Sequence, residues 1–171
     1  MRQLRFIINL KKPYLFPVSL CLLLTSMTSL ADISKAPAIH LPAIEGEVDL
    51  VQLQDKLVYL DFWASWCDPC RDSFPWMAEM KEKYGSDGLE VVAVNLDKER
   101  TLADKFLDTM KVNFVVAFDA SGESAEKYKL RGMPGSYLIG RDGNIQASNL
   151  GFNDRDKAKL EAALKVLLQQ Q

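Results

Sequence analysis

The stretch LDFWASWCDPCRDSFPWM, residues 60–77, places two cysteines at a change of sequence pattern. The segment KLVYLDFWA, residues 56–64, is a nearly continuous apolar run with one acid, Asp61, and this pattern predicts a strand buried on both faces. The residues after Cys67 have the apolar spacing of a helix. We therefore predict that Cys67 and Cys70 lie where a buried strand passes into a helix.

The first 31 of the 171 residues differ in character from the rest. They begin with basic residues, continue through an apolar core and end in small residues, which is the layout of a secretory signal peptide cleaved after Ala31. An uncleaved membrane anchor is the alternative, because the uncharged stretch 13–31 has 19 residues, close to the length that spans a bilayer. We therefore predict a signal segment, residues 1–31, followed by one exported domain, residues 32–171.

The predicted domain is acidic and retains only two cysteines. Without the four basic residues of the signal segment it has 17 Lys and Arg against 23 Asp and Glu, a net charge of −6, so it has no electrostatic reason to bind nucleic acid. An oxidising compartment would allow Cys67 and Cys70 to form a disulfide. Because so short a loop restricts the unfolded chain little, the spacing favours chemistry over stabilisation.

Other uses of a C-x-x-C pair fit the sequence poorly. A structural zinc site needs four ligands, and His40 is the only histidine. A c-type haem anchor needs a histidine after the second cysteine, where this chain has Arg71. A peroxide-reducing cysteine of the form P-x-x-x-T-x-x-C would need a threonine where Ala64 stands. The sequence therefore predicts a dithiol–disulfide redox pair, with no metal and no cofactor.

The remaining pattern alternates between strands and helices, which predicts an α/β fold with a central mixed β-sheet flanked by helices. In the segment 99–110 we expect Leu102, Phe106 and Met110 to form the buried helix face. The predicted elements are strands at 89–97 and 113–119, helices at 67–84, 99–110 and 121–130, hairpins at 36–53 and 135–151, and an amphipathic helix at 154–170.

The segment LVYLDFWASWCDPC, residues 57–70, resembles the active-site strand and turn of thioredoxins, which carry W-C-x-P-C after an F-W-A stretch. Asp61 stands where thioredoxins have a buried aspartate, and Pro75 stands where they have a proline that kinks the helix. The segment LRGMPGSYLI resembles their cis-proline loop and places Pro134 as the cis-proline. The resemblance implies a thioredoxin-like fold over residues 36–168.

Two further segments narrow the resemblance to TlpA-like thiol–disulfide oxidoreductases, a redoxin-type group of the thioredoxin superfamily. Residues 36–56 resemble their N-terminal hairpin, and residues 100–119 resemble their inserted helix and strand. The chain departs from thioredoxins at two positions. Ala93 stands near the place of a lysine that often accompanies the buried aspartate, and Gly135 follows the expected cis-proline where threonine is common. We expect Gly135 to loosen the substrate groove.

The position of the cysteines at a helix N-terminus indicates their roles. Unpaired N–H groups and the helix dipole favour an anion there, so we expect Cys67 to be an exposed nucleophile with a lowered pKa. Cys70, one turn further on, is expected to be the buried resolving thiol. The resemblance implies that Asp61 exchanges the proton of Cys70, because burial raises the pKa of a carboxyl group. The alternative for Asp61 is a strand-end acid bonded to backbone.

Neighbouring residues complete the expected site. Trp66 is expected to shape the exposed rim, and Trp63 is expected to pack in the core. The resemblance implies that Met133, Pro134 and Gly135 bind a substrate peptide, with backbone near Met133 exposed for strand-like pairing.

The dipeptide between the cysteines, Asp68-Pro69, is uncommon at this position. Asp68 adds negative charge beside the developing thiolate, so it should raise the pKa of Cys67 and make the pair more reducing. The alternative is that Asp68 is a solvated surface acid. We therefore expect Asp68, together with Pro69, to modulate the redox pair.

The TlpA-like resemblance implies a periplasmic location, protein disulfides as substrates and a membrane thiol carrier as electron donor. We expect a monomeric reductase of protein disulfides, with cytochrome c maturation or periplasmic redox homeostasis as its role. Two alternatives stay open: a disulfide-introducing oxidase or isomerase, and a redox-inert thioredoxin-like binding or chaperone domain.

Overall fold

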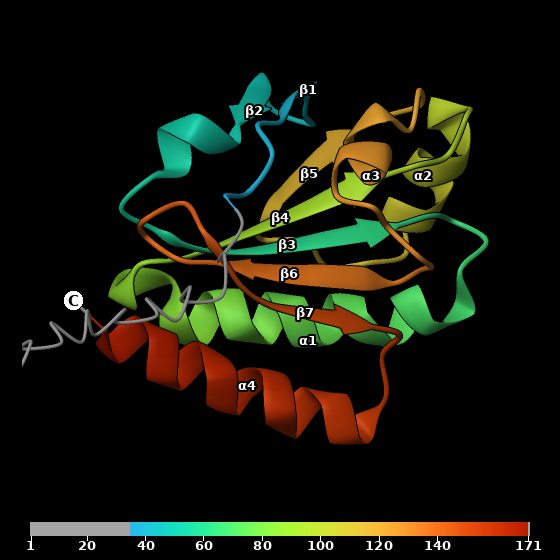
Figure 1. The fold of residues 1–171 in the computed structure, drawn as a ribbon. Coiled ribbons are helices and arrows are strands. Elements are labelled where there is room, and N and C mark those ends of the chain that lie inside the picture. Colours follow the sequence, from blue (N-terminus) through green and yellow to red (C-terminus); the bar gives the residue numbers. More distant parts are fainter. Residues whose placement is uncertain (1–34, 171) are drawn as a thin grey trace, which may run out of the picture. The chain divides into compact units, whose positions relative to one another are not determined.

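The central strand of the fold is β3, Leu57–Trp63, which is buried along its whole length. The computed structural model describes residues 35–170, so the expected signal segment, residues 1–31, lies outside the described residues. β3 lies between β4 (Leu89–Asn95) and β6 (Gly135–Ile139) in a five-stranded sheet of order β5-β4-β3-β6-β7 (Figure 1). Its continuous apolar sequence is therefore explained by neighbours on both edges and cover on both faces.

The sheet is mixed, as predicted. β4 and β5 (Val115–Phe118) run parallel to β3, whereas β6 runs antiparallel to β3 and forms a hairpin with β7 (Ile145–Leu150). This hairpin turns at Asp142 and Gly143: the Asp142 carboxylate accepts the N–H of Asn144 at 3.0 Å, and Gly143 has a φ of +74°.

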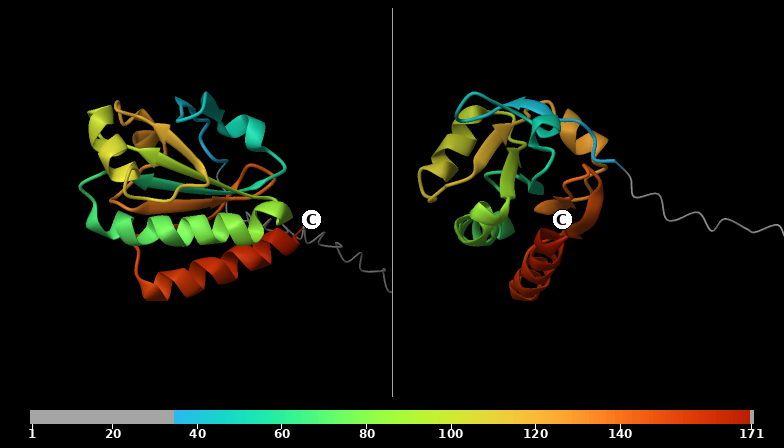
Figure 2. Two further views of the ribbon diagram at one scale, coloured as in Figure 1. Left: turned by 180° about the vertical axis from the view of Figure 1, so that it is seen from behind. Right: turned by 90° about the vertical axis from the view of Figure 1, so that its left-hand side faces the viewer.

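Two long helices cover one face of the sheet (Figures 1 and 2). These are α1 (Asp68–Tyr84), which ends in a short 3-10 turn η2 (Gly85–Asp87), and α4 (Asp154–Gln169). The short helix α2 (Arg100–Leu107) contributes Phe106 to the same apolar core.

The opposite face carries the N-terminal hairpin and the short helix α3 (Glu123–Lys127). The hairpin consists of β1 (His40–Pro42) and β2 (Glu47–Asp49), which pair antiparallel, followed by a 3-10 turn η1 (Leu50–Leu53). The predicted hairpin and the predicted short helix are confirmed.

β3 separates two apolar cores because its side chains alternate between the faces of the sheet. Tyr59 and Trp63 belong to the core beneath α1, and Leu60 and Phe62 belong to the core beneath the N-terminal hairpin. Asp61 falls between Tyr59 and Trp63 in this alternation. Its carboxyl group therefore faces the side of the sheet that α1 covers.

The structure corrects the expected buried face of α2. Leu102 is 40% exposed, whereas Ala103 and Phe106 are buried. The helix ends at Leu107, so Met110 lies beyond it, partly buried against the core. In so short a helix, one turn of spacing between Ala103 and Phe106 defines the face toward the sheet.

The last helix, α4, begins as a capped amphipathic helix. The Asn153 side chain accepts the N–H of Arg155 at 3.0 Å, which makes Asn153 the cap residue. Leu160 and Leu164 are buried against the core. Within residues 35–170, no helix has the length and apolar character needed to cross a bilayer.

Candidate active site

Cys67 and Cys70 form a disulfide at the start of α1. Their sulfur atoms are 2.07 Å apart and their Cα atoms 5.3 Å apart. Cys67 is the residue before the helix, and its N–H donates to the carbonyl of Ala64 at 3.1 Å. The sequence places the pair here because β3 ends at Trp63, and the turn that follows delivers Cys67 directly to the helix terminus.

The accessibility of the pair differs from the expectation for Cys67. Cys67 is only 4% exposed and Cys70 is fully buried, whereas Trp66 is 69% exposed. The expectation of an exposed Cys67 is therefore wrong for the disulfide form. The expectations of a buried Cys70, an exposed Trp66 and a core-packed Trp63 agree with the structure.

The start of α1 presents an electropositive terminus to Cys67. The Cys67 side chain makes no capping hydrogen bond, and Asp68 and Pro69 occupy the first two helical positions with exposed side chains. Proline has no N–H, so it suits this position in the first turn. Unpaired N–H groups and the helix dipole at such a terminus stabilise a thiolate, which is the reactive form of cysteine.

Asp61 is a buried acid without a compensating charge. It is 1% exposed, and its Oδ2 atom has no hydrogen-bond partner within the described part of the chain. In the sheet register it pairs with Ala93 on β4 and Ser136 on β6, neither of which carries a charge. Burial therefore raises the pKa of Asp61 well above its usual value.

The loop before β6 lies at the same end of the sheet. The Met133–Pro134 peptide bond is cis, as the resemblance implied. Gly135 pairs with Phe62 near the end of β3, and the carbonyl of Pro134 accepts the N–H of Gly151 at 2.8 Å. These contacts fix the loop beside the strand that leads to Cys67.

Gly135 allows close packing within this loop. A Cβ atom on Gly135 would lie 2.3 Å from Cδ1 of Leu130 and 2.8 Å from the carbonyl oxygen of Gly132. Real side chains do not come this close, so the backbone packs into space that only glycine leaves free.

The structure adds one residue to the site, Asp97, which sequence reasoning missed. Its carboxylate accepts the N–H of Ser65 at 2.8 Å, in the turn before Cys67. A polar residue two positions beyond the end of β4 was the available signal, because the ends of parallel strands meet at one edge of the sheet. Residues 35–170 contain no cluster of three or more potential metal ligands.

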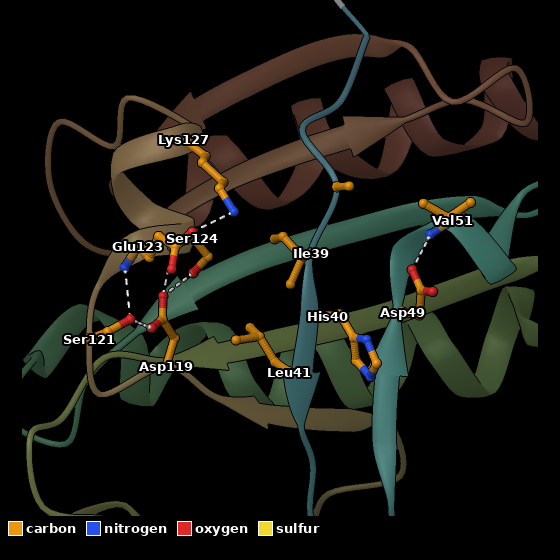
Figure 3. A pocket seen from close by; sticks show the side chains of 11 residues that line it. Ile39, His40, Leu41, Asp49, Val51, Asp119, Ser121, Glu123, Ser124 and Lys127 are labelled. Carbon is orange, nitrogen blue, oxygen red and sulfur yellow. Dashed lines mark hydrogen bonds and ion pairs between the residues drawn. The ribbon is translucent and has the colours of Figure 1, made fainter.

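A pocket elsewhere in the described part of the chain does not involve the cysteines. The pocket in Figure 3 lies between β1, β2 and residues 119–127. Its Asp119 is already bonded to Ser121, Gly122 and Ser124, so no unpaired acid faces it.

The sheet order, the cis-proline loop and a C-x-x-C disulfide at a helix N-terminus define a thioredoxin-like thiol–disulfide oxidoreductase. The chain belongs to the AhpC/TSA family, whose sequence model matches residues 34–148. This confirms the resemblance to redoxin-type proteins of the thioredoxin superfamily.

Individual relatives agree with this assignment. The chain is 39% identical over 141 residues to the thiol-disulfide oxidoreductase ResA of Oceanobacillus iheyensis, covering 80% of this chain and 72% of the relative. It is 33% identical over 134 residues to the protein of the same name from Bacillus thuringiensis, covering 78% and 76%. A crystal structure from Chlorobium tepidum, described as a candidate thiol:disulfide interchange protein DsbE, is similar with a TM-score of 0.78 and 47% identity, covering 79% of this chain and 96% of that one.

Proposed function

We propose that this oxidoreductase works as an exported reductase of protein disulfides, with Cys67 as the attacking thiol. The Cys67 thiolate attacks one sulfur of a substrate disulfide, forming a mixed disulfide and releasing the other substrate sulfur as a thiolate that takes up a proton. The Cys70 thiolate then attacks Cys67, which releases the second substrate thiolate and restores the Cys67–Cys70 disulfide. Two electrons pass from the protein to the substrate in each cycle.

The observation that carries this proposal is the disulfide at the N-terminus of α1, with a free helix terminus at Cys67 and a fully buried partner in Cys70. Cys67 is itself only 4% exposed, so the two cysteines differ in position and not in burial: Cys67 precedes α1, whereas Cys70 lies in its first turn. This difference in position supports one thiol that meets the substrate and one that resolves the mixed disulfide. Trp66 lies on the exposed rim beside them.

Asp61 has the properties of the group that takes the proton from Cys70. A carboxyl group with a raised pKa can both accept and return a proton near neutral pH. The side of β3 that carries Asp61 also carries Trp63 and faces α1, the helix that contains Cys70.

Met133, Pro134 and Gly135 are proposed to hold the substrate segment. The loop lies at the end of β3, and Met133 is only partly buried. Within the described residues Met133 takes part in none of the backbone hydrogen bonds outside helices and strands, so its N–H and carbonyl can pair with an extended peptide, as a strand pairs with a sheet edge.

The direction of electron flow and the location are further parts of the proposal. Asp68, exposed beside Cys67, disfavours the thiolate as a leaving group and thereby favours a reducing pair. The composition of residues 1–31 supports export to the periplasm, where a membrane thiol carrier would return electrons to a monomeric domain. Cytochrome c maturation and general periplasmic redox homeostasis are the roles that fit this activity.

The test is the equilibrium reduction potential of the Cys67–Cys70 pair against dithiothreitol or glutathione. A value between about −270 and about −220 mV supports a reductase, whereas a value near about −120 mV identifies a disulfide-introducing oxidase. A second assay measures the reduction of insulin disulfides by the wild type, with the Cys67→Ser variant as the control that lacks the attacking thiol. Activity that survives Cys67→Ser contradicts the mechanism, and an inactive wild type would indicate a redox-inert binding domain.

A further inference from the structure

Asp97 lies next to the active-site turn because β3 and β4 end together. Asn95, the last residue of β4, pairs in register with Trp63, the last residue of β3. The N–H of Leu96 donates to the carbonyl of Trp63 at 2.9 Å, which continues the pairing beyond the strands. The parallel direction of the strands therefore brings Asp97 beside the residues that precede Cys67.

The carboxylate of Asp97 is held by three hydrogen-bond donors. The N–H of Ser65 donates to Oδ2 at 2.8 Å, and the Ser65 hydroxyl donates to Oδ1 at 2.9 Å. The side-chain amide of Asn95 donates to Oδ2 at 2.8 Å. Asp97 is 4% exposed and Asn95 is 1% exposed, so water competes little with these bonds.

The ligands of this carboxylate point to a role in orientation. Within residues 35–170 no lysine or arginine forms an ion pair with Asp97. Two of its three bonds go to the backbone and side chain of one residue, Ser65. Two hydrogen bonds from one residue to the same carboxylate fix both the position and the orientation of Ser65.

Ser65 lies inside the turn that delivers Cys67 to α1. The N–H of Cys67 donates to the carbonyl of Ala64, so Ser65 and Trp66 are the two central residues of the turn. Trp66 points into solvent and is 69% exposed, so it gives the turn little support. Within residues 35–170, the two bonds between Asp97 and Ser65 are the only side-chain hydrogen bonds made by residues 64–67. We call these two bonds the Asp97–Ser65 clamp.

We propose that Asp97 and Ser65 are positioning residues for the redox reaction, and that their hydrogen bonds keep Cys67 at the N-terminus of α1 when the disulfide opens. The inference rests on Cys67 being the attacking thiol, as proposed above. A thiolate is stabilised there only while its sulfur stays close to the helix terminus. Loosening the turn should therefore make Cys67 less reactive.

Two alternative roles of Asp97 predict different effects of substitutions at Asp97 and Ser65 on the reactivity of Cys67. If only its negative charge mattered, Asp97→Asn would make Cys67 more reactive, because an opposing charge is lost, and Ser65→Ala would have no effect. If the clamp served only the stability of the fold, both variants would unfold more easily and leave the reactivity of Cys67 unchanged.

Asp119 offers a matched control at the end of the neighbouring strand. It follows β5, is 4% exposed and accepts the N–H groups of Gly122 at 2.9 Å and Ser124 at 2.7 Å. The hydroxyls of Ser121 and Ser124 also donate to it. Asp119→Asn thus disrupts a similar buried network that is bonded to residues 121–124 and not to the active-site turn.

The experiment measures the rate of iodoacetamide alkylation of Cys67 from about pH 5 to about pH 10 in the reduced full-length chain. All variants also carry Cys70→Ser, so that Cys67 is the one remaining thiol of the pair. Mass spectrometry of the peptide that contains Cys67 distinguishes its alkylation from that of Cys21. We expect Ser65→Ala and Asp97→Asn to raise the apparent pKa of Cys67 and to slow alkylation at pH 7 about threefold or more. Ser65→Thr should restore the rate, and Asp119→Asn should leave the profile unchanged.

The outcomes separate this inference from the proposed function. An unreactive Cys67 in the parent protein would contradict the proposed function itself. A reactive Cys67 with the same pH profile in Ser65→Ala, Asp97→Asn and Asp119→Asn would overturn the clamp alone, as would faster alkylation in Asp97→Asn.

Discussion

Asp61 on β3 lies directly opposite Ala93 on β4, so a buried carboxyl group has a methyl group as its register neighbour. Burial without a charge partner raises the pKa of Asp61 well above its usual value. Its Oδ2 atom also has no hydrogen-bond partner within the described residues. Asp61 is therefore costly to the folded state whenever it ionises. Its raised pKa fits the proposed role in exchanging a proton with Cys70.

We expect Asp61→Asn to stabilise the protein at neutral and alkaline pH, by about 1–3 kcal/mol. A raised folded-state pKa means that the unfolded chain loses its proton first as the pH rises above the usual value of 3.8, so the wild type becomes less stable relative to the variant. The two proteins should have similar stabilities near pH 3. Urea unfolding from pH 3 to pH 9 measures the difference, and a difference that does not grow with pH would contradict the prediction.

The same variant should slow the chemistry. Without a proton acceptor for Cys70, we expect the mixed disulfide with the substrate to resolve up to about 10²-fold more slowly, while Cys67 attacks at an unchanged rate. Stopped-flow measurement of both steps with a model disulfide checks this. Equal slowing of both steps would argue that Asp61 is not the base.

Gly135→Ala should destabilise the protein by about 1–3 kcal/mol and lower insulin-reduction activity. The added Cβ would collide with Leu130 and with the carbonyl of Gly132, which forces the loop at Pro134 to shift. Gly85→Ala is the control, since its Cβ would meet only the Lys81 side chain at 3.6 Å in helical backbone. Thermal unfolding should leave Gly85→Ala at or above wild-type stability.

Glu161, in the middle of α4, joins this helix to the C-terminal end of α1: it accepts bonds from Lys83 and Tyr84 at 2.7 Å each and pairs with Lys165 at 3.2 Å. These bonds lower the pKa of Glu161 from 4.5 to about 2. The resulting stability is complete above about pH 4.5 and is lost as the pH falls through about 2.

We therefore expect Glu161→Gln to lower stability by about 0.5–1 kcal/mol at pH 7 and to have less effect near pH 2. Glu123→Gln, which breaks the exposed pair of Glu123 with Lys127, serves as the control and should change stability by less than about 0.5 kcal/mol. Acid titration of urea-unfolding midpoints tests both. If the stability difference between Glu161→Gln and the wild type were the same at pH 7 and pH 2, the ion pairs of Glu161 would not be its cause.

Asp68→Asn should make the redox pair less reducing. The loss of a negative charge beside Cys67 stabilises its thiolate, so we expect a lower Cys67 pKa and a less negative reduction potential. Asp72→Asn, which removes an exposed charge one helical turn further along α1, should shift both quantities less. If neither quantity moves in Asp68→Asn, the side chain is only a solvated surface acid.

The strands and helices were predictable because each has a strong local pattern. The unbroken apolar run of β3 and the Asp142-Gly143 turn left few alternatives. The face of α2 was mispredicted, because Leu102 and Ala103 are both apolar and only packing decides which is buried. The close packing of Leu130 against Gly135 was not predictable for a related reason: it depends on how the loop folds back, which the linear sequence does not record.

The sequence by itself determined the redox pair, the order of strands and helices, and the acid on the central strand. These depend on spacing between residues close together in the chain, which a linear pattern records directly. Only the tertiary structure decided that Asp61 pairs in register with Ala93, that Cys67 is buried, and that Asp97 hydrogen-bonds to Ser65, 32 positions away in the sequence. Such contacts arise from the parallel pairing of β3 with β4, whose register is set by packing on both faces of the sheet.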